Sequence, residues 1–406
     1  MNFIYSTNIR KGEKLFIPMN DLVSEYKRNK NKINKAIFKV INSGNFTLGE
    51  EVELFEKEFA NFCGCKYAAG VGSGTSALHL SLIACGIGQG DEVITVPNTD
   101  IPTAMSISHV GAKIIFVDVD YDTFNIDTSQ LEQKITKFTK AIIPVHIFGL
   151  PADMTEINRI AKKYNLKIIE DAALATGAEV NGIKVGSLGD VGCFSLAPNK
   201  ILGAYGDAGV ITTNKKNIAD KIKISSNYGH SLKMNERKYG VGKKGITKWE
   251  LLEEGYNERL DTLQASILRV KLSMLKLNIK KRIDLANNYT KYLSQKIKKQ
   301  KYSNNFKHVY RAYPCFVKKK NYISKKLSEK GISTNSYYTP PLHLQPVYKR
   351  LGLKKGSFPV SEELSKELIC LPIYPSLSKL NQEYIINNFN IKIIIEHLCN
   401  LLSDGQ

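Results

Sequence analysis

A serine and a lysine five positions apart, Ser195 and Lys200, are the residues whose types and spacing first suggest chemistry. They lie in the run S-L-A-P-N-K-I-L-G-A-Y-G-D-A-G, directly after the apolar segment Val191–Phe194. Its glycines permit the backbone angles and close approach that a tight loop needs. We expect a strand end to hold Ser195 against an anion while the Lys200 amine reaches a carbonyl group, where a desolvated lysine can form a Schiff base. A solvated loop lysine is the alternative, so this interpretation depends on partners elsewhere in the chain.

A second candidate site is the run G-S-G-T-S at positions 72–76. It follows the apolar segment Tyr67–Val71, which is typical of a short strand, and precedes a helical pattern over Ala77–Cys85. A helix that starts in this way presents free backbone N–H groups and its positive end to an anion. The third glycine of G-x-G-x-x-G and the G-K-[ST] ending of a P-loop are both missing. The run therefore argues against a nucleoside triphosphate and leaves a single phosphate open.

Two further residues carry groups that can titrate or bind a ligand. Asp171 follows Ile168-Ile169-Glu170 at an expected strand end. It could bind a metal, act as a base or pair with a heterocyclic nitrogen, and metal is the weakest option because no carboxylate or histidine cluster with ligand spacing lies nearby. The sequence thus predicts no metal site. His343 ends the aromatic, proline-pinned run Tyr337–His343, and a lone histidine of this kind is more often structural than catalytic.

These residues require a scaffold that brings several strand ends together. From Asp91 to Thr213 apolar strands alternate with helical patterns, which predicts an α/β fold with a large, mostly parallel sheet covered by helices on both faces. Ligands of such sheets collect at the carboxyl ends of the strands. The expected strands are Glu92–Val96, Ile114–Val119, Ala141–Val145, Lys167–Glu170, Val191–Ser195 and Gly209–Thr212, and the expected helices are Ile101–His109, Ser129–Thr136, Met154–Lys163 and Asn217–Ser225.

The pattern changes after the middle of the chain. Amphipathic helices are expected near the N-terminus at Lys30–Ile41 and Glu50–Phe62, and a long helix at Thr262–Leu277 leads to a second unit. That unit reads as a helix, strands and a helix, at Asp284–Lys298, Val309–Val317 and Tyr322–Lys330. We therefore place a large domain at residues 1–277 and a smaller α+β domain at residues 278–406.

Composition limits the class of protein. The 406 residues are 43% hydrophobic and 24% charged, as in a soluble globular protein, without an apolar run long enough to span a membrane or a signal peptide's apolar core. The seven scattered cysteines fit reduced thiols in a cytoplasmic protein. Residues 1–200 hold 21 Lys and Arg against 22 Asp and Glu, whereas the rest hold 37 against 16. The basic half could attract an anionic substrate, nucleic acid or membrane, but its lysines read better as exposed helix faces, so neither nucleic acid nor membrane is an expected partner.

The ordered motifs along the chain resemble one known family, the DegT/DnrJ/EryC1/StrS family of pyridoxal-phosphate (PLP) aminotransferases, most of which act on nucleotide-linked keto-sugars. The resemblance runs from about Ile17 to His397. It rests on S-G-N-F-T-L-G at 43–49, G-S-G-T-S-A-L-H-L at 72–80, G-D-E-V-I-T-V-P at 90–97, K-A-I-I-P-V-H at 140–146, E-D-A-A at 170–173, the Ser195/Lys200 loop, Y-G-D-A-G at 205–209, G-Y-N-E-R-L-D at 255–261, P-L-H-L-Q-P at 341–346 and L-P-I-Y-P at 371–375.

The resemblance implies a PLP-dependent transferase of fold type I, similar to aspartate aminotransferase, that passes through a pyridoxamine-phosphate form. It implies transfer of an amino group from an amino acid, L-glutamate in most members, to a keto-sugar, most often a nucleotide-linked 3- or 4-keto-deoxysugar. Lys200 would be the Schiff-base lysine, and Asp171 would pair with the pyridine nitrogen. The implied phosphate ligands are Gly74, Thr75, Ser76 and Ser195, together with Asn257 from the neighbouring subunit of a homodimer with shared active sites. Arg259 and His343 would face the sugar nucleotide, and the planar fork of Arg259 would suit a diphosphate or a donor carboxylate.

Two positions near the implied cofactor depart from the family pattern. Leu174 stands where most members carry Gln or His, and Ile101 stands where many carry an aromatic residue that stacks on the PLP ring. Three alternatives remain: a sugar dehydratase of the same fold, against which Lys200 argues because histidine replaces the lysine there; an aminotransferase acting on a keto-sugar without a nucleotide or on a cyclitol; and a PLP-binding or nucleic-acid-binding regulator. No helix-turn-helix or zinc-finger signature supports the last.

Overall fold

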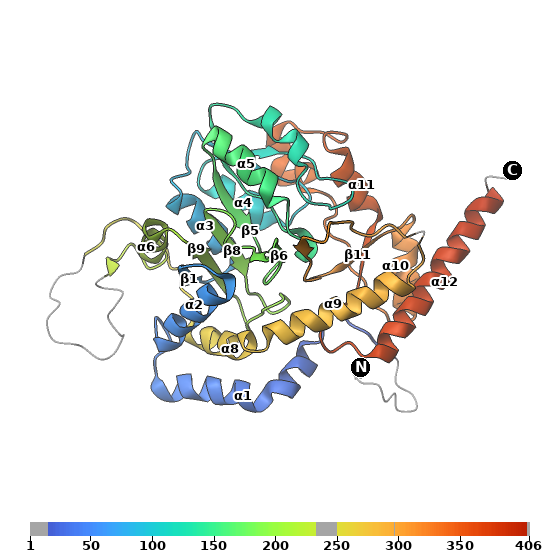
Figure 1. The fold of residues 1–406 in the computed structure, drawn as a ribbon, viewed down its shortest axis with the longest axis horizontal. Helices are drawn as coiled ribbons and strands as arrows, with labels where there is room; N and C mark the ends of the chain where they lie inside the picture. Colours follow the sequence, from blue (N-terminus) through green and yellow to red (C-terminus); the bar gives the residue numbers. More distant parts are fainter. Residues whose placement is uncertain (1–14, 233–249, 296, 404–406) are drawn as a thin grey trace.

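The computed structural model describes residues 15–232, 250–295 and 297–403, and a seven-stranded sheet organises most of them (Figure 1). Its strand order is β1-β9-β8-β5-β4-β2-β3, and β9 is the one antiparallel strand within this sheet. The expected mostly parallel sheet is therefore confirmed. In chain order the strands are β1 (Tyr67–Val71), β2 (Glu92–Thr95), β3 (Lys113–Phe116), β4 (Thr139–Ile142), β5 (Lys167–Asp171), β8 (Val191–Ser195) and β9 (Gly209–Thr213).

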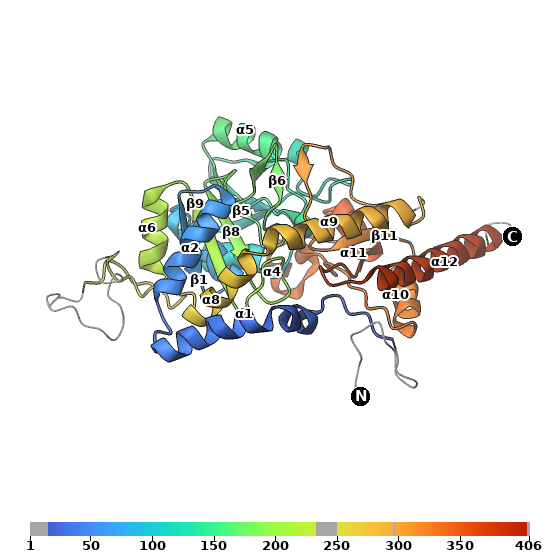
Figure 2. The same cartoon turned by 60° about the horizontal axis from the view of Figure 1, so that its bottom comes forward.

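Helices cover both faces of the sheet because its strands are apolar on both sides. On one face α3 (Gly74–Ala84), α4 (Ile101–His109) and α6 (Lys216–Ser225) form a core with the sheet. The other face packs against α2 (Glu50–Cys63) and α8 (Thr262–Leu272) over β1, β9 and β8, and against α5 (Met154–Tyr164) over β5 and β4. Helix α1 (Leu22–Ser43) lies against α8, as Figures 1 and 2 both show.

A separate core lies in the C-terminal part of the chain. It contains side chains from α9 (Leu275–Tyr292), β11 (Tyr313–Phe316), α10 (Lys320–Glu329), β12 (Leu368–Leu371) and α12 (Lys379–Ser403). Ile17 is buried in the same core and forms a parallel bridge with Ile332. The N-terminal residue Ile17 thus packs with the C-terminal part of the chain, although the sequence predicts it in the large domain. The other helices and strands of the described residues are the short β6 (Glu179–Val180), β7 (Ile183–Lys184) and β10 (Phe306–Lys307) and helix α11 (Pro359–Glu367), apart from short 3-10 turns.

Several expected elements differ from the structure. The helix expected at Ser129–Thr136 is replaced by two 3-10 turns, Thr128–Gln130 and Glu132–Lys134. The Asp127 carboxylate accepts hydrogen bonds from the backbone N–H and the hydroxyl of Ser129, at 3.0 and 2.6 Å. Short polar side chains that bind nearby backbone groups compete in this way with a regular helix.

The other differences lie in the connection between the two cores and in the strand that follows it. The helix expected at Thr262–Leu277 ends at Leu272, and α9 begins at Leu275 and continues to Tyr292, in place of the helix expected at Asp284–Lys298. Of the strand expected at Val309–Val317, only Tyr313–Phe316 is extended in a sheet. The predicted boundary after residue 277 falls inside the first turn of α9, and this helix contributes side chains to both cores. The division into domains therefore stays a prediction.

None of the helices within the described ranges combines the length and apolarity needed to cross a membrane.

Candidate active site

The start of α3 and the end of β8 meet at one edge of the sheet. Ser73 caps the helix by accepting the N–H of Ser76 at 3.0 Å. Gly74 lies so close to Ser195 that a Cβ on the glycine would stand 2.6 Å from the Cβ of Ser195. The first-turn N–H groups of Gly74 and Thr75 have no partners within the helix, so they are open to an anion. The structure thus brings Gly74, Thr75 and Ser195 together, as predicted.

The hydroxyl of Ser76 has partners within the chain. Its Oγ lies 2.7 Å from the Oγ of Ser73 and donates a hydrogen bond to the Glu258 carboxylate. Gly72 donates its N–H to the Glu258 carbonyl at 3.0 Å, which holds the segment against the α3 turn. Ser76 therefore lies in the predicted cup, but a carboxylate shares its hydroxyl.

Asp171 is the last residue of β5, and its carboxyl is buried. Oδ2 accepts a hydrogen bond from the Thr103 hydroxyl at 2.7 Å, and Oδ1 accepts the Ala173 N–H at 3.1 Å. Burial raises the pKa of Asp171 above its ordinary value, against the opposing effects of these hydrogen bonds and of the charges on Lys200 and His146. A cationic partner would restore the ionised form. The site therefore suits a ligand group that becomes positively charged on binding a proton.

The Lys200 amine lies in the same region, beyond the end of β8. Burial is the largest cause that lowers its pKa, to about 8, and the charge on Arg311 lowers it further. Asp171 and Asp100 act in the opposite direction. An amine with this pKa is partly unprotonated near neutral pH, which a nucleophile or a proton carrier requires.

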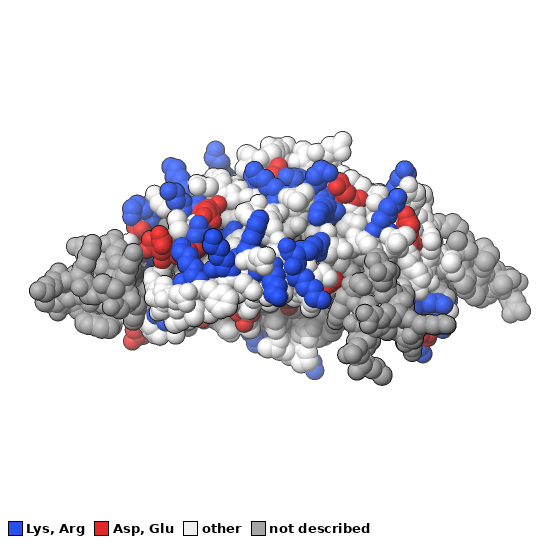
Figure 3. All heavy atoms as spheres, turned by 90° about the horizontal axis from the view of Figure 1, so that it is seen from below, with Lys and Arg blue, Asp and Glu red and all other residues white. Residues whose placement is uncertain are grey.

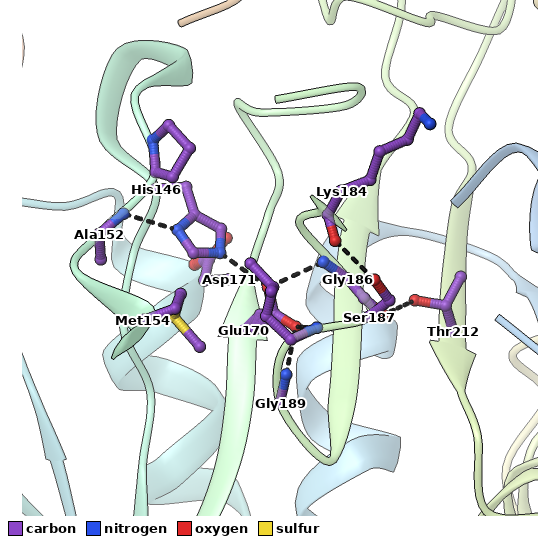
Figure 4. A network of polar contacts seen from close by, with 12 residues as sticks. His146, Ala152, Met154, Glu170, Asp171, Lys184, Gly186, Ser187, Gly189 and Thr212 are labelled. Atoms are coloured by element: carbon purple, nitrogen blue, oxygen red, sulfur yellow. Dashed lines mark hydrogen bonds and ion pairs between the residues drawn. The ribbon is translucent and has the colours of Figure 1, made fainter. Parts of the chain in front are cut away.

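A buried polar network supports the strand end that carries Asp171 (Figure 4). The Glu170 carboxylate accepts backbone N–H groups from Gly186, Leu188 and Gly189 at 2.7–2.9 Å, and its Oε2 lies 3.0 Å from Nε2 of His146. Nδ1 of His146 accepts the N–H of Ala152 at 3.0 Å, so Nε2 carries the proton that Glu170 accepts. Backbone groups next to this network also hold the end of β5.

Backbone hydrogen bonds connect this network directly to Asp171. Its N–H donates to the Pro144 carbonyl at 2.9 Å, and its carbonyl accepts the His146 N–H at 3.0 Å. The backbone of Asp171 is therefore held by Pro144 and His146, and the side chain of the preceding residue, Glu170, is held by its own network. These contacts restrict the direction of the Asp171 carboxyl.

The two residues that depart from the family pattern lie at different depths. Ile101 is the first residue of α4 and is 40% exposed, two positions before Thr103. Leu174 is half-buried and packs against the core beneath β4 and β5. Neither position is occupied by a hydrogen-bonding side chain. Their contact with a cofactor stays a prediction.

The remaining predicted residues do not join Lys200 within one chain. Asn257 is exposed and forms an isolated antiparallel bridge with Asn227. Arg259 donates to the Asn227 side chain at 2.9 Å, stacks over Tyr228 and lines a pocket of about 390 Å³ that does not include Lys200. These two residues therefore face a different part of the surface from the Lys200 amine.

His343 is buried, with its Nε2 3.0 Å from the Glu362 carboxylate and its ring against Phe358. These contacts favour the structural role that a lone histidine more often has. Its predicted contact with the sugar nucleotide is untested.

The sequence analysis missed Thr103, Glu258 and Arg311, and it gave no role to His146. His146 directly follows the expected strand Ala141–Val145, which is the position where site residues collect, whereas Thr103 lies inside the expected helix Ile101–His109. Glu258 lies inside the G-Y-N-E-R-L-D motif, between Asn257 and Arg259. Arg311 had no signal, because its segment reads only as part of a strand.

The residues gathered at this edge match three parts of one small molecule. The α3 turn with Ser195 can hold an anionic group, Lys200 can react with a carbonyl carbon, and Asp171 can pair with a basic ring nitrogen. Pyridoxal phosphate carries all three groups. The close approach of Gly74 to Ser195 suits its phosphate. The buried Asp171 carboxyl, which forms no hydrogen bond to a cationic side chain of the described residues, suits the ring nitrogen.

Comparisons with known proteins agree with this geometry. The model of the DegT/DnrJ/EryC1/StrS aminotransferase family matches residues 27–390. The chain is 41% identical to a dTDP-3-amino-3,6-dideoxy-alpha-D-galactopyranose transaminase of Aneurinibacillus thermoaerophilus, over 92% of this chain and 99% of the relative. It is 40% identical to a pleiotropic regulatory protein of Geobacillus stearothermophilus, over 91% and 96%.

Solved structures share the fold. That of S. venezuelae DesV in complex with a ketimine intermediate superposes with a TM-score of 0.87 at 33% identity, covering 93% of this chain and 98% of that one. Other structural neighbours have been solved with the pyridoxal or the pyridoxamine form of the cofactor.

Proposed function

The chain belongs to the DegT/DnrJ/EryC1/StrS family of PLP-dependent aminotransferases, and from this premise we propose that it aminates C3 of a nucleotide-linked keto-sugar. We take L-glutamate as the amino donor. The support for C3 is that several relatives are named for 3-amino or 3-oxo sugars linked to dTDP or UDP. Identity is highest among these to a dTDP-sugar transaminase, so a dTDP-linked 3-keto-6-deoxysugar is the substrate we test first.

The observation that carries this proposal is the gathering of Lys200, Asp171 and the α3 turn at one sheet edge. Bound PLP supplies an electron sink for the carbanion that forms when the substrate loses its Cα proton. Asp171 would stabilise the positive charge on the ring nitrogen, and Gly74, Thr75 and Ser195 would hold the phosphate. The Lys200 amine, with its pKa at about 8, would take and return the proton at the reacting carbon.

We further propose that the enzyme works as a homodimer in which Asn257 and Arg259 serve the partner's site. Asn257 lies among exposed apolar residues, Tyr228, Leu251, Leu252 and Tyr256. Exposed apolar side chains gathered in this way are typical of an interface. The cytoplasmic location expected from the sequence stays part of this proposal.

The test is a half-reaction screen. The enzyme is converted to its pyridoxamine form with L-glutamate, freed of keto acid, and mixed with dTDP- and UDP-linked 3-keto and 4-keto sugars. We expect the absorbance of PLP to return with the dTDP-linked 3-keto sugar, and Lys200→Ala to abolish the return. Borohydride reduction followed by peptide mapping should place the cofactor on Lys200. Return of absorbance only with a keto-sugar lacking a nucleotide, or with a cyclitol, would contradict the substrate assignment.

One observation favours a second function. A relative is named a pleiotropic regulatory protein, and the face shown in Figure 3 carries many more Lys and Arg than Asp and Glu. Exposed basic residues of α1 and α9 are Lys27, Arg28, Lys30, Lys32, Lys35, Lys39, Lys276, Lys280 and Lys291. A gel shift with random DNA over a salt series separates the two functions. Tight binding that survives physiological salt, together with no transamination, would favour a regulator.

A further inference from the structure

Arg311 is a buried arginine whose charge has no partner. The residue is 5% exposed, and Nε is completely enclosed without a hydrogen-bond acceptor. Within the described part of the chain, no carboxylate or carbonyl pairs with its guanidinium. Arg282 shows the usual alternative, since this buried arginine donates to the carbonyls of Ile373 and Tyr310 at 2.6 and 3.3 Å.

The position of Arg311 is fixed beside the active site. Its backbone N–H donates to the Phe148 carbonyl at 2.8 Å, and Phe148 lies two residues after His146, which is hydrogen-bonded to Asp171. The side chain is close enough for its charge to act on Lys200 and on Tyr338, a partly buried residue that Asp100 and Asp171 also influence. Arg311 therefore lies near the Lys200 amine and the end of the strand that carries Asp171.

An unpaired buried charge costs stability, because the desolvation of the ion is not compensated. A guanidinium fork is suited to one kind of partner, a planar carboxylate or a phosphate that accepts two parallel hydrogen bonds. The reaction offers both kinds of anion. The amino-acid donor carries its α-carboxylate directly on the carbon that reacts, whereas the diphosphate of a nucleotide sugar is separated from C3 by the sugar ring.

We propose that Arg311 binds the α-carboxylate of the amino-acid donor. The inference rests on the proposed aminotransferase function and adds a donor subsite to it. Placed beside Lys200, the guanidinium holds the donor so that its amine and Cα face the lysine. The keto-sugar carries no carboxylate at that place, so Arg311 acts mainly in the half-reaction with the amino acid.

The test compares two donors that differ only at the α-carboxyl group, L-glutamate and its α-amide L-isoglutamine. Conversion of the PLP form to the pyridoxamine form is followed in single turnovers for the wild type, Arg311→Gln and Arg311→Lys. We expect Arg311→Gln to lower kcat/KM for L-glutamate by about 30- to 300-fold, the range for loss of a charge-assisted hydrogen-bonded pair. The rate with L-isoglutamine should change little, so the preference for the acid disappears. Arg311→Lys keeps the charge without the fork and should lie between.

A stability measurement and a control variant separate binding from folding. Thermal unfolding of the apoprotein should show Arg311→Gln at least as stable as the wild type, because the variant removes an unpaired buried charge. Arg350→Gln changes an exposed arginine and should leave both donors unaffected. Equal losses on the two donors, or an unchanged preference for L-glutamate, would overturn the inference. Failure of the wild type with both donors would instead contradict the proposed function, and this inference with it.

Discussion

At the proposed reacting centre, burial acts on two groups of opposite charge, Lys200 and Asp171. It lowers the pKa of the Lys200 amine and raises the pKa of the Asp171 carboxyl, so both charged forms are less stable than in water. A ligand with a carbonyl carbon and a protonated ring nitrogen relieves both costs. Burial of these two groups therefore lowers the stability of the folded apoprotein, and the proposed ligand would recover that free energy on binding.

The first prediction concerns the Asp171 carboxylate. Asp171→Asn should fold normally and lose about 3–5 kcal/mol of transition-state stabilisation, because the amide cannot keep a ring nitrogen protonated. Single-turnover rates of the half-reaction with L-glutamate measure this loss. Asp153→Asn is the matched control, since Asp153 caps α5 at an exposed position where Asn caps equally well. Transamination by Asp171→Asn within tenfold of the wild-type rate would show that the assignment is wrong.

The second prediction uses the pKa of Lys200. The amine titrates at about 8 in the folded apoprotein and at 10.5 when unperturbed, so between these values the unfolded chain binds more protons. The free energy of unfolding should therefore rise with pH from about 8 to 10.5, by up to about 3 kcal/mol from this group. Lys200→Met removes that rise, and denaturant titrations across this pH range measure the difference between the two proteins.

A second lysine variant controls for the loss of one positive charge. Lys32→Met changes an exposed position on α1 and should keep the wild-type profile. Parallel profiles for the wild type and Lys200→Met would mean that the Lys200 amine is not buried in the folded apoprotein.

The sequence could predict the residues whose chemistry depends on local order along the chain. Gly74, Ser195 and Asp171 follow directly from strand ends and a helix start, and the structure brings them to one edge. Thr103, Glu258 and Arg311 could not be predicted in this way. Each reaches the site from another segment through a tertiary contact, and no local pattern distinguishes it from a surface residue.

At the scale of elements, the start of α3 is the most informative contact. The segment around Glu258 lies against this turn, and the carboxylate that accepts the Ser76 hydrogen bond points at the place predicted for a phosphate. Two negative groups there repel each other unless one moves or takes a proton. The Glu258 side chain thus opposes phosphate binding in this arrangement.

The third prediction follows from this repulsion. Glu258→Gln should bind PLP about three- to tenfold more tightly, because a neutral amide keeps a polar partner for Ser76 without repelling the phosphate. Fluorescence titration of the apoprotein with PLP gives the dissociation constants. Glu254→Gln, an exposed change in the same segment, is the control. Weaker PLP binding by Glu258→Gln would mean that the carboxylate supports the cup instead of competing with its ligand.

Elements with clear periodicity were predicted closely, and the misses have local causes. Strand β1 and helix α4 have the predicted bounds, because turns and caps mark both ends. The helix expected at Ser129–Thr136 does not form, because the Asp127 carboxylate binds the backbone N–H and the hydroxyl of Ser129 at its start. The helical pattern after Thr262 hides a break at Ser273 and Met274, since apolar spacing alone cannot show where one helix ends and the next begins.

At the scale of the molecule, the exposed segment around Asn257 is where the proposed homodimer would complete the site. Glu258 points at the α3 turn of its own chain, whereas its neighbour Asn257 is exposed. Adjacent side chains of an extended segment point to opposite sides. Asn257 therefore points away from its own cup, and in the proposed homodimer it would face the second subunit.

The last prediction tests this shared site by mixing two defective variants. Lys200→Ala removes the reacting amine, and Asn257→Asp places a negative charge beside the partner's phosphate. In a mixed dimer one site inherits both defects and the other inherits neither. Random exchange makes about half of the dimers mixed, so roughly a quarter of all sites should be intact. Co-refolded variants should thus recover about a quarter of the wild-type activity, after subtraction of the residual activity of Asn257→Asp.

The separate homodimers and a tagged exchange assay complete the experiment. Co-purification of an untagged variant with a tagged one confirms that subunits have mixed, and the two homodimers measured alone give the baseline. If mixing is confirmed and activity stays at the sum of the homodimers, Asn257 acts within its own chain. Recovery above that sum requires Lys200 and Asn257 to come from different subunits, because only that arrangement puts both defects into one site and leaves the other whole.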